Sequence, residues 1–87
     1  MKIELRKYGD LLISRPAGRE AAMVERAISK PMSDTELIEI DFDGVGVLTP
    51  SWIDEFIQVI KENFKNKIVF LSSQNSSVIE SLKFLSK

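Results

Sequence analysis

The sequence contains neither cysteine nor histidine among its 87 residues. Without cysteine there are no disulfides, no thiolate nucleophile and no cysteine-ligated zinc or iron–sulfur site. Without histidine, the chain lacks the side chain used most often as a general base and as a metal ligand. An enzyme of this composition would depend on carboxylates, lysine, tyrosine or serine. The composition therefore favours a non-enzymatic domain, and we expect neither a metal nor another cofactor.

The sequence also lacks a strong charge of one sign and a long apolar segment. The sequence has 12 Lys and Arg residues and 13 Asp and Glu residues, which gives a formal net charge of −1. This balance provides no strong positive field for binding nucleic acid or anionic membranes. No stretch approaches the roughly 20 apolar residues of a membrane span, and the mixed charges of residues 1–6 are unlike a signal peptide. We expect a cytoplasmic protein that binds neither nucleic acid nor membranes.

The sequence does contain enough apolar residues for a core, because 44% of the chain is hydrophobic. Its four glycines and three prolines are scattered, and no composition shift or repeat marks a linker. A chain of this length has room for one domain. We therefore expect residues 1–87 to form a single domain.

Hydrophobic periodicity predicts the order strand, strand, helix, strand, helix, strand, helix. Alternation over 2–6, a turn at 8–10 and an apolar return at 11–13 predict an antiparallel hairpin at the N-terminus. The later elements are expected from Pro16 to Pro31 (helix), at 37–42 (strand), from Thr49 and Pro50 onward (helix), at 67–71 (strand) and from 75 onward (helix). Alternating strands and helices imply parallel strands with right-handed crossovers. The predicted class is α/β, with a mixed sheet that joins the hairpin to parallel strands.

The same periodicity predicts which side chains are buried. In the first helix we expect an inner stripe of Ala17, Ala21, Val24 and Ile28, with Glu25 outside it. The nearly continuous apolar run at 67–71 is typical of a central strand. The predicted core includes Ile40, Phe42, Ile57, Ile68 and Phe70.

Two carboxylates at the end of the strand at 37–42 suggest one enzymatic interpretation. The segment that carries Asp41, Asp43 and Gly44 resembles the first motif of haloacid-dehalogenase-type phosphatases, in which two such carboxylates hold Mg²⁺. The alternative function is therefore a small Mg²⁺-dependent phosphotransfer enzyme that uses Asp41 and Asp43. That chemistry needs a later acidic pair, which is missing because no aspartate follows Asp54. A structural role is simpler, because aspartate readily accepts hydrogen bonds from nearby backbone N–H groups in turns.

A longer motif points elsewhere. Residues 40–56 read Ile-Asp-Phe-Asp-Gly-Val-Gly-Val-Leu-Thr-Pro-Ser-Trp-Ile-Asp-Glu-Phe. This pattern resembles the STAS-like family, a domain family of unknown function related to STAS domains. Tyr8-Gly9, Ser14-Arg15 and Gly18 resemble the opening of that family, so the resemblance runs from about Tyr8 to Phe70.

The resemblance implies a bacterial regulatory module. STAS domains, of which anti-sigma-factor antagonists are the best-known group, dock on a partner ATPase or kinase of the GHKL type. The loop and helix start after the third strand form their docking surface. In this sequence that surface would include Thr49, Ser51, Trp52, Asp54 and Glu55. The leading hypothesis is a signalling adaptor that binds such a protein partner; a purely assembling subunit, or a homo-oligomer, is also compatible with the sequence.

Three of these residues have a second interpretation. Antagonists of that group carry a phosphorylated serine at this helix start, but the matching position here is Pro50, with Thr49 before it and Ser51 after it. Ser51 is therefore either a phosphorylation site or a plain helix cap. Trp52 is either an interface anchor or a core residue. Asp54 either complements the helix dipole or binds Arg15.

Overall fold

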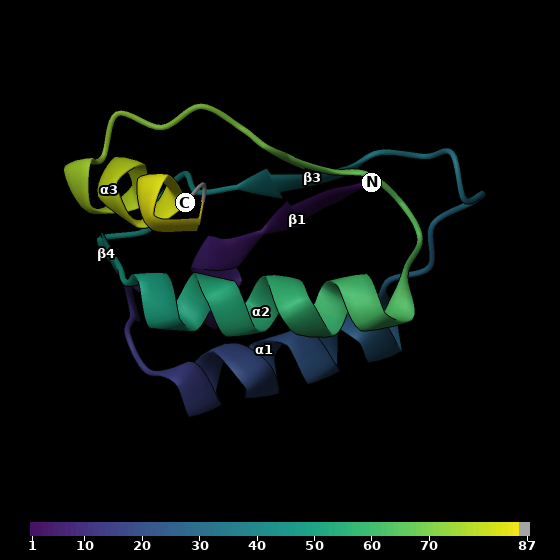
Figure 1. The fold of residues 1–87 in the computed structure, drawn as a ribbon, viewed down its shortest axis with the longest axis horizontal. Helices are drawn as coiled ribbons and strands as arrows, with labels where there is room; N and C mark the ends of the chain where they lie inside the picture. Colours follow the sequence, from purple (N-terminus) through teal and green to yellow (C-terminus); the bar gives the residue numbers. More distant parts are fainter. Residues whose placement is uncertain (86–87) are drawn as a thin grey trace.

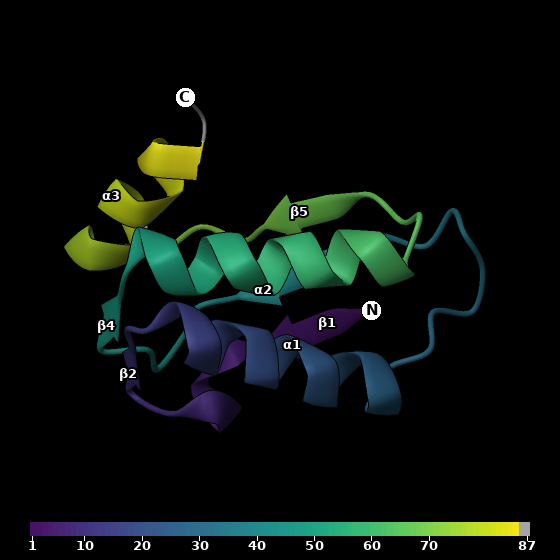
Figure 2. The ribbon, with the colours of Figure 1, turned by 60° about the horizontal axis from the view of Figure 1, so that its bottom comes forward.

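The computed structural model describes residues 1–85. Its elements in chain order are β1 (Lys2–Glu4), the 3₁₀ helix η1 (Leu5–Tyr8), β2 (Leu11–Leu12), α1 (Arg15–Ile28), β3 (Ile38–Asp41), β4 (Val47–Leu48), α2 (Pro50–Asn63), β5 (Ile68–Phe70) and α3 (Ser76–Leu85). Figures 1 and 2 together label all of them except η1. The predicted α/β class and the order of the predicted elements are confirmed. η1 and β4 are additions that periodicity did not predict, because each is only a few residues long.

The predicted N-terminal hairpin is wrong. The strands form a three-stranded sheet in the order β1-β3-β5 and a two-stranded sheet of β2 and β4. All these pairs are parallel, with Ile3 opposite Ile40 and Leu12 opposite Leu48. η1 buries Leu5 directly after β1 and ends at Gly9, where φ is 123°. The chain therefore leaves β1 instead of folding back on it, and β3 takes the position beside β1.

β5 is an edge strand and not the central strand that its apolar sequence predicted. It pairs with β3 in the register Ile38 to Ile68, and β3 is the strand flanked on both sides. Ile40 and Phe42 are buried as expected, as is Ile57. Ile68 is only partly buried and Phe70 is 36% exposed, because within residues 1–85 no strand flanks β5 on its outer side.

Helices α1 and α2 lie side by side across one face of the three-stranded sheet (Figure 1; Figure 2). The side chains of β1 and β3 that point toward them, among them Ile3 and Ile40, are fully buried. The alternate side chains of these strands are charged, and Lys2 Nζ lies 3.6 Å from Asp41 Oδ2. Strand alternation thus sends the apolar residues under the helices and the charged ones to the opposite face.

Helix α1 faces the core with a different stripe from the predicted one. Its buried residues are Gly18, Ala21, Ala22 and Glu25. Val24 and Ile28 are 51% and 64% exposed. At Gly18 an added Cβ would lie 2.3 Å from the backbone oxygen of Trp52. The helix is therefore rotated to place glycine, and not a β-branched residue, where α1 and α2 approach most closely.

Helix α3 is attached to β4 by polar side chains. Asn75 Nδ2 donates to the carbonyls of Val45 and Gly46 at 3.0 and 2.9 Å. The Leu48 backbone N–H donates to Ser77 Oγ at 3.1 Å, and the Ser81 hydroxyl donates to the Leu48 carbonyl at 2.9 Å. These bonds satisfy backbone groups of β4, which within residues 1–85 has β2 as its one neighbouring strand.

Within residues 1–85, none of the helices combines the length and the apolar character needed to cross a membrane.

Candidate functional site

The start of α2 is held by Thr49, which is its N-cap. Its Oγ1 accepts a hydrogen bond from the Trp52 N–H at 3.3 Å. The same hydroxyl donates to the Ile13 carbonyl at 2.5 Å, and the Thr49 N–H donates to the Leu12 carbonyl at 3.0 Å. Pro50 follows in the first turn, where a missing N–H costs nothing. Thr49 thus joins β2 to α2 and is already occupied by structural bonds.

Trp52 belongs to the core. It is 1% exposed and stacks on Phe56, with ring centroids 5.1 Å apart and planes 11° apart. The Tyr8 ring lies 6.5 Å from it. The core interpretation of this tryptophan is therefore correct, and its expected role as an exposed interface anchor is wrong, because the helix turns the ring under α1.

The two carboxylates of this turn face the N-terminal half of α1. Asp54 Oδ2 accepts from Arg15 Nη1 at 2.9 Å and from Gln58 Nε2 at 3.0 Å. The Arg15 hydrogen bond, followed by that of Gln58, holds the pKa of Asp54 below its usual range. Glu55 lies within 4 Å of the guanidinium groups of both Arg15 and Arg19. The predicted bond between Asp54 and Arg15 is confirmed.

Ser51 is exposed and lines a depression of about 370 Å³. Its lining residues come from the starts of α1 and α2 and from the end of α3: Arg15, Pro50, Ser51, Asp54, Phe84 and Leu85. Phe84 is 63% exposed. An exposed hydroxyl, a guanidinium and an apolar ring together make a surface suited to recognition. Sequence reasoning did not include Phe84, because nothing in the chain order indicates that α3 ends beside the start of α2.

Asp41 is the last residue of β3, and Asp43 lies in the turn that follows. Asp41 Oδ1 accepts from the Asp43 N–H at 3.0 Å, and its other oxygen faces Lys2. Gly44 completes the turn with φ of 83°. The structural role predicted for Asp41 is confirmed. Among residues 1–85, no three or more carboxylate-bearing side chains gather as a possible metal site.

A family model for a STAS-like domain of unknown function (DUF4325) matches residues 21–78, about two thirds of the chain. The matched region includes Ser51 but ends before Phe84, and it begins after Arg15. No curated protein and no solved structure matches the chain.

Proposed function

Because this chain belongs to the family of STAS-like domains of unknown function, we propose that it is a non-enzymatic cytoplasmic adaptor that regulates a protein partner in bacterial signalling. The partner we propose is an ATPase or kinase of the GHKL type, as the relation to STAS domains implies. The observation that carries this proposal is the depression around Ser51, which combines exposed polar and apolar groups on a rigid base.

The docking surface of this proposal consists of Arg15, Pro50, Ser51, Asp54 and Phe84, and is referred to below as the α2-start surface. It keeps Ser51 and Asp54 from the predicted set, whereas Thr49 contributes by shaping the turn. Glu55 lies beside the α2-start surface and is not part of it, since its carboxylate faces Arg19 and Arg15. Phe84 replaces Trp52 as the aromatic anchor, because an exposed ring can be buried by a partner.

Phosphorylation of Ser51 is the proposed means of regulation. A phosphate there would lie at the positive end of α2 and close to Arg15. It would also compete with Asp54 for the Arg15 guanidinium, which lies 2.9 Å from Asp54 Oδ2. The added charge would therefore change both the electrostatics and the pairing of the α2-start surface, and we expect it to release the partner.

A binding titration against purified GHKL-type ATPases of the source organism tests this function. Phe84→Ala should weaken binding by more than about 1 kcal/mol if the ring is an anchor. Ser51→Asp should also weaken it while the thermal unfolding of the chain stays unchanged. Ser33→Asp is the matched control, since Ser33 is exposed in the loop between α1 and β3. Figure 2 shows this loop near the end of α2, away from its start. Equal affinity of wild type, Phe84→Ala and Ser51→Asp would contradict the α2-start surface.

A further inference from the structure

The outer edge of β5 has no neighbouring strand in residues 1–85, since β5 pairs with β3 alone. Its bonds to β3 use alternate residues: the Ile38 N–H donates to the Lys67 carbonyl, and the Leu71 N–H donates to the Ile40 carbonyl. In a parallel ladder the intervening residues direct their backbone groups to the other side. The N–H and C=O groups of Ile68 and Phe70 therefore face the free edge, which is a template for pairing with another strand.

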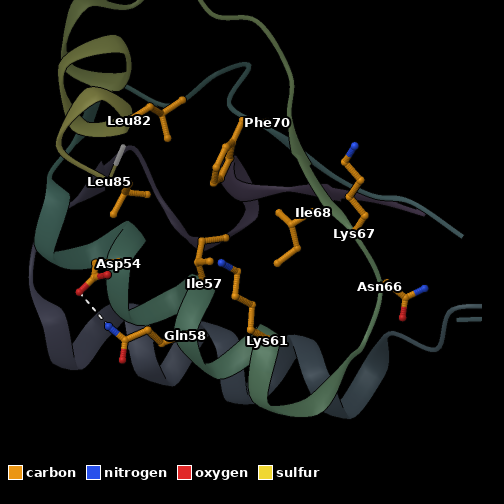
Figure 3. Close-up of a pocket in the computed structure, with 10 residues that line it drawn as sticks. All are labelled: Asp54, Ile57, Gln58, Lys61, Asn66, Lys67, Ile68, Phe70, Leu82 and Leu85. Atoms are coloured by element: carbon orange, nitrogen blue, oxygen red, sulfur yellow. Dashed lines mark hydrogen bonds between the residues drawn. The ribbon is translucent and has the colours of Figure 1, made fainter. Parts of the chain in front are cut away.

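Beside this edge is a groove of about 550 Å³ between α2, β5 and α3. Figure 3 shows Ile57 of α2 on one side and Ile68 and Phe70 of β5 on the other, with Leu82 and Leu85 of α3 at one end. Ile68 and Phe70 are in register with the buried residues Ile38 and Ile40, so the groove continues the core face of the sheet. Here that face lacks the cover that α1 and α2 give to β1 and β3.

The charges at the rim of the groove are unbalanced. Lys61 of α2 and Lys67 at the start of β5 both line it. The lysines that form ion pairs within residues 1–85 are Lys2, Lys7 and Lys83, so neither of the two groove lysines has a carboxylate partner there. The carboxylate that lines the groove, Asp54, is already paired with Arg15 at 2.9 Å. The rim is therefore positive, and a negatively charged occupant complements it.

We propose that the β5 edge and this groove bind an extended segment of a protein partner, which adds as a strand to β5 and carries both apolar side chains and carboxylates. Its backbone bonds to Ile68 and Phe70. Its groove-facing apolar side chains cover Ile57, Ile68 and Phe70, and a carboxylate reaches Lys61 or Lys67. This is strand addition, in which main-chain bonds provide affinity and alternate side chains provide specificity.

This docking site goes beyond the proposed function and does not depend on it. The α2-start surface is tested at Ser51 and Phe84, neither of which lines the groove, whereas the groove is tested at Lys61. Asp54 and Leu85 line both places and are left unchanged in every variant. The two proposals are separated if variants at Ser51 and Phe84 weaken binding of the ATPase but not of a groove peptide, or if a variant at Lys61 weakens binding of the peptide but not of the ATPase.

The test is a selection of random peptides, about eight residues long and thus within the usual range of strands, on the immobilised chain. We expect enriched peptides that alternate apolar residues and contain Asp or Glu. Lys61→Glu should weaken an enriched peptide by about tenfold or more, and Lys65→Glu by less than about twofold. Lys65 is the matched control because it is exposed and lies outside the groove.

Two further measurements identify the mode of binding. Two N-methylated versions of an enriched peptide should be compared, one methylated at the odd-numbered amides and the other at the even-numbered amides. Methylation of the amides that face β5 should abolish binding, and methylation of the amides that face away from β5 should leave it intact. In ¹⁵N-resolved NMR spectra, the amides of Ile68 and Phe70 should shift most.

Three results would overturn the proposal: no enriched peptide, enrichment without carboxylates, or equal binding to the Lys61→Glu variant. A wild-type dimer in sedimentation whose β5 amides are shifted by self-association would also overturn it, since a second copy would then occupy the edge.

Discussion

At the scale of single residues, Glu25 is a charged side chain that is buried in the core. It is 1% exposed, and the Tyr8 hydroxyl donates to its Oε1 at 2.5 Å. Lys7 Nζ lies 2.8 Å from the same oxygen, and the Ser29 hydroxyl donates to Oε2. Burial alone would raise the pKa of Glu25, but the hydrogen bonds from Lys7, Ser29 and Tyr8 together outweigh it and leave the pKa lowered. The carboxylate therefore fastens η1 and the end of α1 to one another.

Glu25→Gln should lower the free energy of unfolding at neutral pH by about 1–3 kcal/mol, because buried donors lose a charged acceptor. Since folding lowers the pKa of Glu25, its contribution is present above the unfolded value of about 4.3 and disappears as the pH falls through the folded value. Urea unfolding from pH 7 to pH 3 should show the difference between wild type and variant narrowing in acid. Glu20→Gln, exposed on the same helix, should change little at any pH. A constant difference down to pH 3 would contradict this account.

At the scale of elements, β3 and β5 are both apolar strands but differ in what surrounds them. Ile40 in β3 is fully buried, so Ile40→Ala should cost about 2–5 kcal/mol. Ile68→Ala in β5 should cost less, about 1–2 kcal/mol, because its side chain is only partly buried in the folded state. Chemical denaturation of both variants measures the difference. Equal losses would indicate that β5 is covered in solution.

At the scale of the whole molecule, the acidic side chains of residues 1–85 do not converge as the phosphotransfer alternative would require. Asp41 bonds the Asp43 N–H and faces Lys2, while Asp54 and Glu55 lie with Arg15 at the start of α2. We predict that the purified chain does not hydrolyse an aryl phosphate in the presence of Mg²⁺. A chromogenic phosphatase assay checks this. Turnover that is lost in Asp41→Asn but retained in Asp34→Asn would establish the enzymatic alternative.

The sequence by itself determined the order of the elements and the start of α2. Thr49 and Pro50 begin α2 as predicted, Asn75 caps α3, and the Asp41–Asp43 turn ends β3, because caps and turns depend on residues only a few positions apart. The bond between Arg15 and Asp54 was one of two sequence interpretations, and only the packing of α1 on α2 selected it.

Only the tertiary structure decided the strand pairing, the face of α1 that is buried and the surroundings of Trp52. β1 and β2 have alternating residues that suit a hairpin, but each pairs with a strand more than 30 positions away. α1 has an apolar stripe at Val24 and Ile28, yet close approach to α2 selects the face with Gly18 and buries Glu25 beside Tyr8. The hydrophobic periodicity of the sequence indicates which residues share one face of a helix or strand. Which other element packs against that face is determined by long-range packing. The exposed ring of Phe84 and the free edge of β5, on which the proposed surfaces depend, follow from that packing alone.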